Sequence, residues 1–212
     1  MKELDLQESL NLLAKEKFAL ARHCFVKNEK ECLKKINEIK FPCVLKLISK
    51  KASHKTEFGL IKTNLKNEIE LKKAFAELNA SAKKHKLKIE AFLLQEMISG
   101  NEIILGGKTD EVFGPIVLAG FGGILTEILN DKSIRLIPVD KKIASEMLQE
   151  LKAFKLLNGY RNQPKANLES LTDLIVQLSK LMEKGKVKEI DLNPVIVNEK
   201  TALIVDARIT LH

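Results

Sequence analysis

The sequence has 212 residues, of which 45% are hydrophobic and 30% charged, as is typical of an ordinary globular chain with one large domain or two small lobes. No apolar run reaches the roughly 18 residues needed to span a bilayer, and the acidic N-terminal segment is unlike a secretion signal, so we expect a cytoplasmic protein. The three cysteines lack the spacing of a zinc site, and we expect them to be reduced thiols. The net charge of +8 indicates an anionic partner, and a single Tyr with no Trp argues against nucleic acid and leaves nucleotides, coenzyme A or an acidic subunit.

Helices and strands alternate irregularly along the chain. Because they do not follow a strict βαβ order, the sequence predicts an α+β fold. A seam near residue 93 predicts a small basic lobe over 1–93 and a larger, glycine-rich lobe over 94–212. In chain order, we expect a helix over 4–17, a strand over 21–26, a helix over 27–39 with Asn28 as its N-cap, strands over 41–49 and 58–65, a helix over 66–85, a strand over 88–98, a glycine-rich region over 100–123, a strand over 134–137, helices over 140–155 and 167–184, and a hairpin over 187–209.

Lys46 lies inside the apolar run VLKLI. A lysine in a buried strand needs an anion nearby, which suggests a phosphate contact, although an edge-strand lysine that reaches solvent is the commoner case. The loop that follows, SKKASHKTEFG, gathers Ser53, His54, Lys55 and Gly59 between two expected strands. Such a loop can surround phosphates with backbone N–H groups and cations, although it is not a Walker loop.

Two carboxylates flank the start of the glycine-rich region. Glu96 ends the strand expected over 88–98, and Glu102 begins the next one. Either carboxylate could accept hydrogen bonds from a base or a ribose where the chain crosses between strands. Two ordinary surface carboxylates would look the same in the sequence.

The C-terminal hairpin carries oxygen ligands on one face. Alternate residues of a strand share a face, so Asp191 and Asn193 point the same way. A turn at Glu199–Lys200 places residues whose numbers sum to 399 opposite each other; Asn193 then faces Asp206, with Asp191 diagonal to it. Carboxylate and amide oxygens suit Mg²⁺. The alternative is a solvated sheet face, but both aspartates are flanked by apolar residues, where an unpartnered carboxylate is costly.

Several segments together resemble a known family. They are FPCVLKLIS with HKTEFGLIKTNL, LLQEMISGNEIILGGKTDEVFGPIVLAGFGGILTEIL, LLNGYRNQP, and EIDLNPVIV with ALIVDARI. They resemble the β subunit of ADP-forming acetyl-CoA synthetases, an ATP-grasp domain related to the β subunit of succinyl-CoA synthetase. The resemblance covers about residues 8–210.

The resemblance implies an ATP-grasp fold of two α+β lobes with the nucleotide between them. It implies the reaction acyl-CoA + ADP + Pi ⇌ acid + CoA + ATP, which passes through a phosphohistidine. The partner would be a CoA-binding α subunit that carries the phosphorylated histidine, in an α2β2 heterotetramer. This chain would bind ADP or ATP with Mg²⁺, without nucleic acid or membrane.

The family's site residues carry over to matching positions. Lys46, with Ser53, Lys55 and Gly59 in the phosphate loop, would contact the nucleotide phosphates. Glu96, Met97 and Ile98 would lie at the adenine, and Glu102 at the ribose. Asp191, Asn193 and Asp206 would hold Mg²⁺, and His54 would take part in phosphoryl relay. The chain has Leu60 after Gly59, and Asn162, where glycine is usual; the Leu60 side chain is expected either to crowd the phosphates or to narrow the motion of the loop.

Three alternatives stay open at this point. One is another acid–CoA ligase of the same superfamily, such as a succinate–CoA ligase, because the α subunit would select the acid. The second is a non-catalytic nucleotide-binding module, motivated by Leu60. The third is a basic nucleic-acid-binding protein, which would lose its ligand at high salt.

Overall fold

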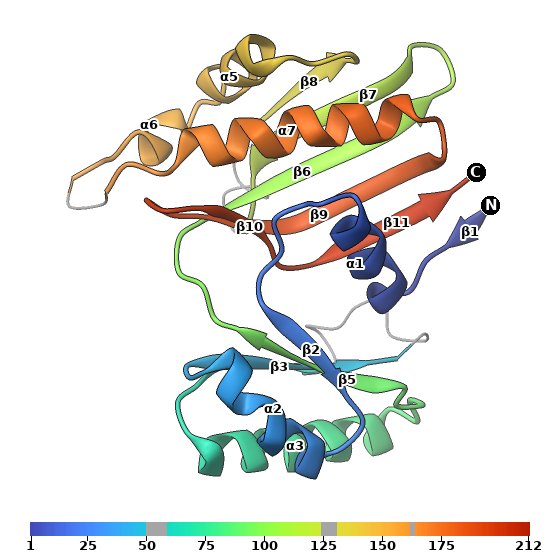
Figure 1. The fold of residues 1–212 in the computed structure, drawn as a ribbon, viewed down its shortest axis with the longest axis vertical. Coiled ribbons are helices and arrows are strands. Elements are labelled where there is room, and N and C mark those ends of the chain that lie inside the picture. The colour runs from blue at the N-terminus through green and yellow to red at the C-terminus, as the bar shows by residue number, and fades with distance from the viewer. Residues whose placement is uncertain (50–58, 124–130, 162–163) are drawn as a thin grey trace. The chain divides into compact units, whose positions relative to one another are not determined.

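The computed structural model describes residues 1–49, 59–123, 131–161 and 164–212 (Figure 1). The chain forms two compact units. Residues 21–98 form the smaller unit, and residues 1–20 join 99–212 in the larger one. The boundary after Ile98 lies close to the predicted seam near residue 93, but residues 1–20, which were predicted to belong to the smaller lobe, belong to the larger unit.

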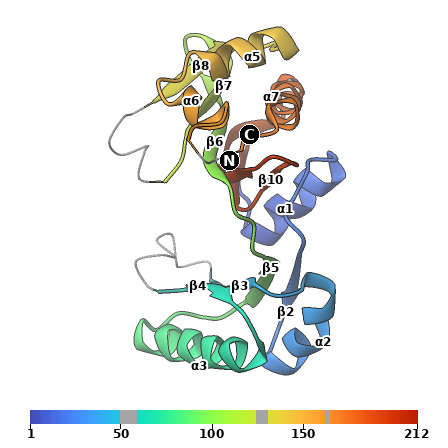
Figure 2. The same ribbon diagram turned by 90° about the vertical axis from the view of Figure 1, so that its left-hand side faces the viewer.

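The smaller unit is a four-stranded antiparallel sheet in the order β2-β5-β3-β4. Leu45 and Leu47 of β3 and Leu94 of β5 point into a core shared with residues of both helices, and Figure 2 shows these helices on one side of the sheet. The elements are β2 (His23–Val26), α2 (Glu29–Ile39), β3 (Cys43–Ile48), β4 (Ile61–Leu65), α3 (Glu68–Lys84) and β5 (Ala91–Glu96).

Both helices of this unit begin with the same short sequence, KNE followed two residues later by Glu. Asn28 caps α2 by accepting from the Glu31 N–H, and Asn67 caps α3 by accepting from the Glu70 N–H. The glutamate in turn accepts from the main chain just before the cap, at Lys27 and Lys66. The repeated local sequence therefore gives the same reciprocal cap twice, and the predicted cap at Asn28 is confirmed.

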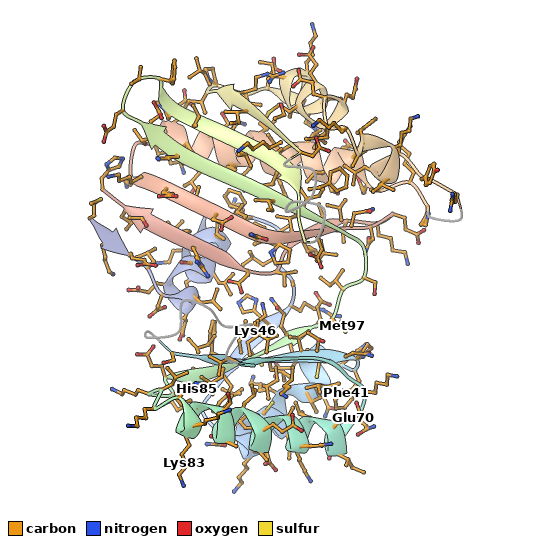
Figure 3. The ribbon with its side chains drawn as sticks, turned by 180° about the vertical axis from the view of Figure 1, so that it is seen from behind. Phe41, Lys46, Glu70, Lys83, His85 and Met97 are labelled. Atoms are coloured by element: carbon orange, nitrogen blue, oxygen red, sulfur yellow. The ribbon has the colours of Figure 1, made fainter. Side chains whose placement is uncertain are left out.

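The larger unit is built on a seven-stranded sheet with the path β1-β11-β9-β6-β7-β8, in which β10 also pairs with β9. Helix α7 packs on one face: a Cβ atom added at Gly107 of β6 would meet Met182 of α7 at 2.8 Å. The opposite face is seen in Figure 3. The elements are β1 (Lys2–Glu3), α1 (Leu6–Lys15), β6 (Asn101–Asp110), β7 (Gly114–Phe121), β8 (Lys132–Leu136), α5 (Lys141–Gln149), α6 (Phe154–Leu157), α7 (Leu168–Glu183), β9 (Val187–Val197), β10 (Ala202–Ile204) and β11 (Ala207–Leu211).

The N-terminal segment belongs to this sheet through its edge. The two residues of β1 pair with Leu211 and Thr210 of β11, and Asp5 starts α1 with a capping box. Leu10 and Leu13 of α1 are fully buried. Over the described ranges, no helix combines the length and the hydrophobicity needed to cross a membrane.

Candidate functional site

The C-terminal hairpin has the predicted register. Ala202 pairs with Val197, Ile204 with Val195 and Arg208 with Asp191, so the residue numbers sum to 399 from the turn as far as the pair of Thr210 with Glu189, after which the register shifts at Leu211. The Asn193 N–H donates to the Asp206 carbonyl at 3.2 Å, between the ends of β10 and β11. The predicted opposition of Asn193 and Asp206 is therefore confirmed.

Alternation along β9 separates the two faces of this hairpin. Ile190 and Leu192 are buried on the side of α7, while Asp191 is half-buried and Asn193 is exposed on the other side. Asp206 is also half-buried, and its Oδ1 accepts from the Ala207 N–H at 2.9 Å. Two carboxylates and an amide thus lie together on the sheet face away from α7.

The electrostatics of this face favour a cation. Burial raises the pKa of Asp191 above its ordinary value of 3.8, and the charges of Asp206 and Glu189 raise it further, while Arg208 acts in the opposite direction. Among the residues that the structure describes, no group of three or more His, Cys, Asp or Glu side chains is arranged so that it could hold a metal ion. The hairpin set has two carboxylates and one amide, which fits Mg²⁺, because this ion takes few protein ligands and completes its shell with water and phosphate oxygens.

Lys46 lies in the interior of the smaller sheet. Its strand, β3, is flanked by β5 and β4, with Leu93 and Ile61 as Cα partners. The Lys46 side chain is buried, at 4% exposure, and points away from the helices because its neighbours Leu45 and Leu47 point into the core (Figure 3). The alternative of an edge-strand lysine that reaches solvent is therefore wrong.

Gln95, a polar residue on the same face of the sheet as Lys46, was not among the residues predicted for the site. Gln95 of β5 pairs with Val44 of β3, so it shares the helix-free face with Lys46, and it is fully buried. The sequence contained a signal for this residue: in the run LLQE, Gln95 follows Leu94, which lies in the core, so Gln95 points to the opposite face of the sheet. The helix-free face of the smaller sheet therefore carries a buried amide and a buried ammonium group, and buried polar groups of this kind need polar partners.

The expected base-binding segment follows β5. The Glu96 N–H donates to the Arg22 carbonyl at 2.9 Å and the Met97 N–H to the Pro42 carbonyl at 3.2 Å, so the course of the main chain toward Ile98 is fixed. The Glu96 carboxylate is bound by Arg22, whose side chain and main-chain N–H both lie 2.7 Å from it. Arg22 was not among the residues predicted for the site.

Glu102 is exposed at the start of β6 and lies over two glycines. The Gly122 N–H donates to the Glu102 carbonyl at 2.7 Å. Gly123 has φ of +60°, and a Cβ atom added there would lie 2.7 Å from Glu102 Oε2. The GFGG segment therefore has a steric role: it lets the main chain turn and pass beneath the Glu102 carboxylate.

The predicted phosphate loop is described only at its end. Ser53, His54 and Lys55, as well as Asn162, lie outside the described residues. Gly59 has φ of +62°, with no atom within 4 Å of an added Cβ. Leu60 was expected to crowd the phosphates, but it is fully buried in the core that includes Leu45 and Phe75.

The candidate residues are divided between the units. Lys46, Gly59 and Glu96–Ile98 belong to the smaller unit, and Glu102 and the hairpin set belong to the larger one.

A family model described as an ATP-grasp domain matches residues 1–211. The β subunit of acetate–CoA ligase (ADP-forming) I from Pyrococcus furiosus is 39% identical over 189 residues, which are 87% of this chain and 82% of that protein. The 4-hydroxybutyrate–CoA ligase (ADP-forming) of Nitrosopumilus maritimus is 37% identical over 97% of this chain, which spans 30% of that longer protein.

Solved structures agree with these relatives. Acetyl-coenzyme A synthetase 1 of Candidatus Korarchaeum cryptofilum, in complex with coenzyme A, Ca-AMPCP and HgCl⁺, superimposes with a TM-score of 0.94 at 34% identity, over 100% of this chain and 94% of that chain. A second structure of that synthetase, with coenzyme A and Mg-AMPPCP and with its phosphohistidine segment pointing towards the nucleotide binding site, has a TM-score of 0.85 at 31% identity over 100% and 93% of the two chains. The chain therefore belongs to the ATP-grasp family and, within it, to the β subunits of the ADP-forming acetate–CoA ligases, which are acid–thiol ligases.

Proposed function

We propose that this chain binds Mg-ADP or Mg-ATP and exchanges a phosphoryl group between the nucleotide and a phosphohistidine. The P–N bond of the phosphohistidine breaks as a P–O bond forms to the β-phosphate of ADP, and ATP leaves. The net reaction is acyl-CoA + ADP + Pi ⇌ acid + CoA + ATP. The cytoplasm is the proposed location.

The observation that carries this proposal is the oxygen-rich face of the hairpin. Asp191 is a half-buried carboxylate whose pKa is raised by burial and by a second carboxylate, Asp206, although Arg208 opposite it acts to lower the pKa. Such a pair is costly in the ligand-free protein, and a divalent cation would remove the cost. Mg²⁺ held by Asp191, Asn193 and Asp206 would bridge phosphate oxygens and offset their charge.

The remaining residues have separate parts in binding. The buried Lys46 ammonium would attract a phosphate and offset charge that develops during transfer. Glu102 would accept from the ribose, since Gly122 and Gly123 hold its main chain and leave room for its side chain. The segment Glu96–Ile98 would bind the base.

The loop residues would handle the phosphoryl group. Ser53, Lys55 and Gly59 would surround the phosphates, and His54 would act as a second phosphoryl carrier or as a positioning group. A neutral imidazole is a competent nucleophile near pH 7, and the lysines next to His54 in the sequence SKKASHK would offset the charge of a phosphorylated ring.

The partner in this proposal is a CoA-binding α subunit with its own phosphorylated histidine, in an α2β2 heterotetramer. Two features of the relatives support a partner: one is named as a β subunit, and another carries the matching region as 30% of a longer chain. The α subunit would select the acid, so acetate is the first candidate, and another carboxylic acid such as succinate or 4-hydroxybutyrate is the alternative. The alternative of a non-catalytic nucleotide-binding module was based on Leu60, and this reason no longer holds because Leu60 lies in the core.

Isothermal titration of the purified chain with Mg-ADP, and with Mg-GDP for comparison, tests the nucleotide site. Lys46→Met should weaken Mg-ADP binding at least tenfold, because a buried cation facing the phosphates is lost. Lys62→Met is the matched control: this lysine lies on the neighbouring strand β4 and pairs with Glu77. Equal affinities for the two variants would contradict the role of Lys46.

Phosphoryl exchange tests the relay. With the α subunit present and labelled ATP supplied, His54→Ala should slow the exchange of label, whereas His85→Ala, at the end of α3, should not. Unchanged exchange in His54→Ala would remove His54 from the relay but leave the nucleotide site intact.

A further inference from the structure

Arg22 and Glu96 form a reciprocal contact. The Arg22 main-chain N–H donates to Glu96 Oε1 at 2.7 Å, and Arg22 Nε donates to Oε2 at 2.7 Å. Arg22 Nη2 also lies 2.7 Å from Oε2, and the Glu96 N–H donates back to the Arg22 carbonyl at 2.9 Å. The contact between Arg22 and Glu96 therefore involves both the side chain and the main chain of each residue.

The pair extends the ladder between β2 and β5 by one position. His23 faces Gln95 in this antiparallel ladder, so Arg22 and Glu96 are the next pair along it. β2 is a four-residue edge strand, with one neighbouring strand to hold it. The contact closes this ladder at the end where the chain enters the smaller unit, after Leu20, and leaves it, after Ile98.

The contact also decides what Glu96 can offer to a ligand. Both carboxylate oxygens accept charge-assisted or main-chain hydrogen bonds, and the Glu96 side chain is 16% exposed. A carboxylate in this state is a poor acceptor for a base or a ribose, because such a ligand would have to displace the guanidinium. What remains available in this segment is its main chain, which the bonds at Glu96 and Met97 hold in place.

We infer that Arg22 is a positioning residue for the nucleotide: it binds Glu96 and thereby fixes the main chain of residues 96–98 against which the base rests. This inference depends on the proposed function for the site but assigns Glu96 an indirect part in it. Loss of either side chain releases the same segment, so the two residues act on nucleotide affinity as one unit.

A double-mutant cycle on Mg-ADP affinity distinguishes indirect from direct action. Arg22→Met and Glu96→Gln should each raise the dissociation constant about fivefold, and the double variant should be no weaker than the weaker single variant. Arg22→Lys should recover part of the affinity, since it restores a positive charge. With the complete enzyme, KM for ADP should rise while kcat stays within about twofold.

The matched control is Arg135→Met. Arg135 of β8, in the larger unit, pairs with Glu150 and donates to Ser133 Oγ on the same strand, so this variant removes the same charge and a similar ion pair elsewhere. Its Mg-ADP affinity should equal that of the wild type. A Glu96→Gln variant that binds weakly while Arg22→Met binds normally would overturn the inference in favour of direct contact, and additive effects or unchanged affinity in both would also overturn it.

Hydrogen exchange separates this inference from the proposed function. In the nucleotide-free chain, Arg22→Met should speed exchange of the Glu96 and Met97 amides, with the Leu94 amide as an internal reference; unchanged exchange would refute the positioning role. Failure of the wild type to bind Mg-ADP would instead refute the proposed function and the nucleotide part of the inference with it.

Discussion

Replacement of Leu60 by alanine should destabilise the smaller unit by about 3 kcal/mol. Leu60 is fully buried within the core, and its carbonyl accepts from the Leu47 N–H at 2.9 Å, so its main chain stays in place after truncation. The change removes three buried carbons, worth about 0.8 kcal/mol each, and leaves a cavity whose cost brings the total into the range of roughly 2–5 kcal/mol for such substitutions. Glycine should cost about 1 kcal/mol more, through the freedom of the unfolded chain.

Urea unfolding followed by circular dichroism measures this loss. Leu136→Ala makes the same chemical change on β8, where the side chain is 56% exposed, and should alter the free energy of unfolding by less than about 0.5 kcal/mol. Equal unfolding curves for the two variants would refute the placement of Leu60 in the core. Tighter Mg-ADP binding by Leu60→Gly, titrated below the unfolding transition, would show that Leu60 crowds the phosphates after all.

Two further predictions concern the larger unit. Gly123→Ala should weaken Mg-ADP binding at least threefold because its Cβ displaces the Glu102 carboxylate, whereas Gly114→Ala, with φ of +77° and open space around it, should have the same backbone cost and unchanged affinity in the same titration. Because the pKa of Asp191 in the folded protein is raised from 3.8, the folded protein loses stability as the pH rises through this raised pKa. The ligand-free Asp191→Asn variant should therefore melt at a higher temperature than the wild type at pH 7, and at a similar temperature near pH 4. The same variant should bind Mg-ADP at least tenfold more weakly; a lower melting temperature at pH 7 would contradict the raised pKa.

Local sequence was enough for most of the elements and for the hairpin, but not for β1 or for β7, which lies in the region that was predicted only as glycine-rich. The apolar alternation around Asp191 and the position of the turn predict both the face and the partner of Asn193, because antiparallel strands joined by a short turn have one register. Asn28 could be placed as a helix cap for a similar reason, since capping depends on residues within one turn of each other.

Contacts between distant segments could not be predicted in this way. Arg22 and Glu96 are 74 residues apart, and nothing in ARH or LQEM indicates that they meet. The return of residues 1–20 to the larger unit depends on two residues of β1 and on the buried face of α1, which read locally as an ordinary N-terminal helix. Leu60 illustrates the same point: its position after Gly59 suggested a place beside phosphates, and tertiary packing placed it in the core.

The register of the hairpin next to its turn restricts how this chain can vary in length. Asn198 Oδ1 accepts from the Lys200 and Thr201 N–H groups, and Asn167, the cap of α7, donates to the carbonyls of Asn198 and Lys200. One residue gained or lost between 198 and 201 would turn Asp206 to the opposite face of the sheet and away from Asn193. Homologous chains that keep the activity should therefore accept insertions and deletions elsewhere but keep this turn at its present length, and an engineered one-residue insertion here should abolish metal-dependent nucleotide binding in a chain that still folds.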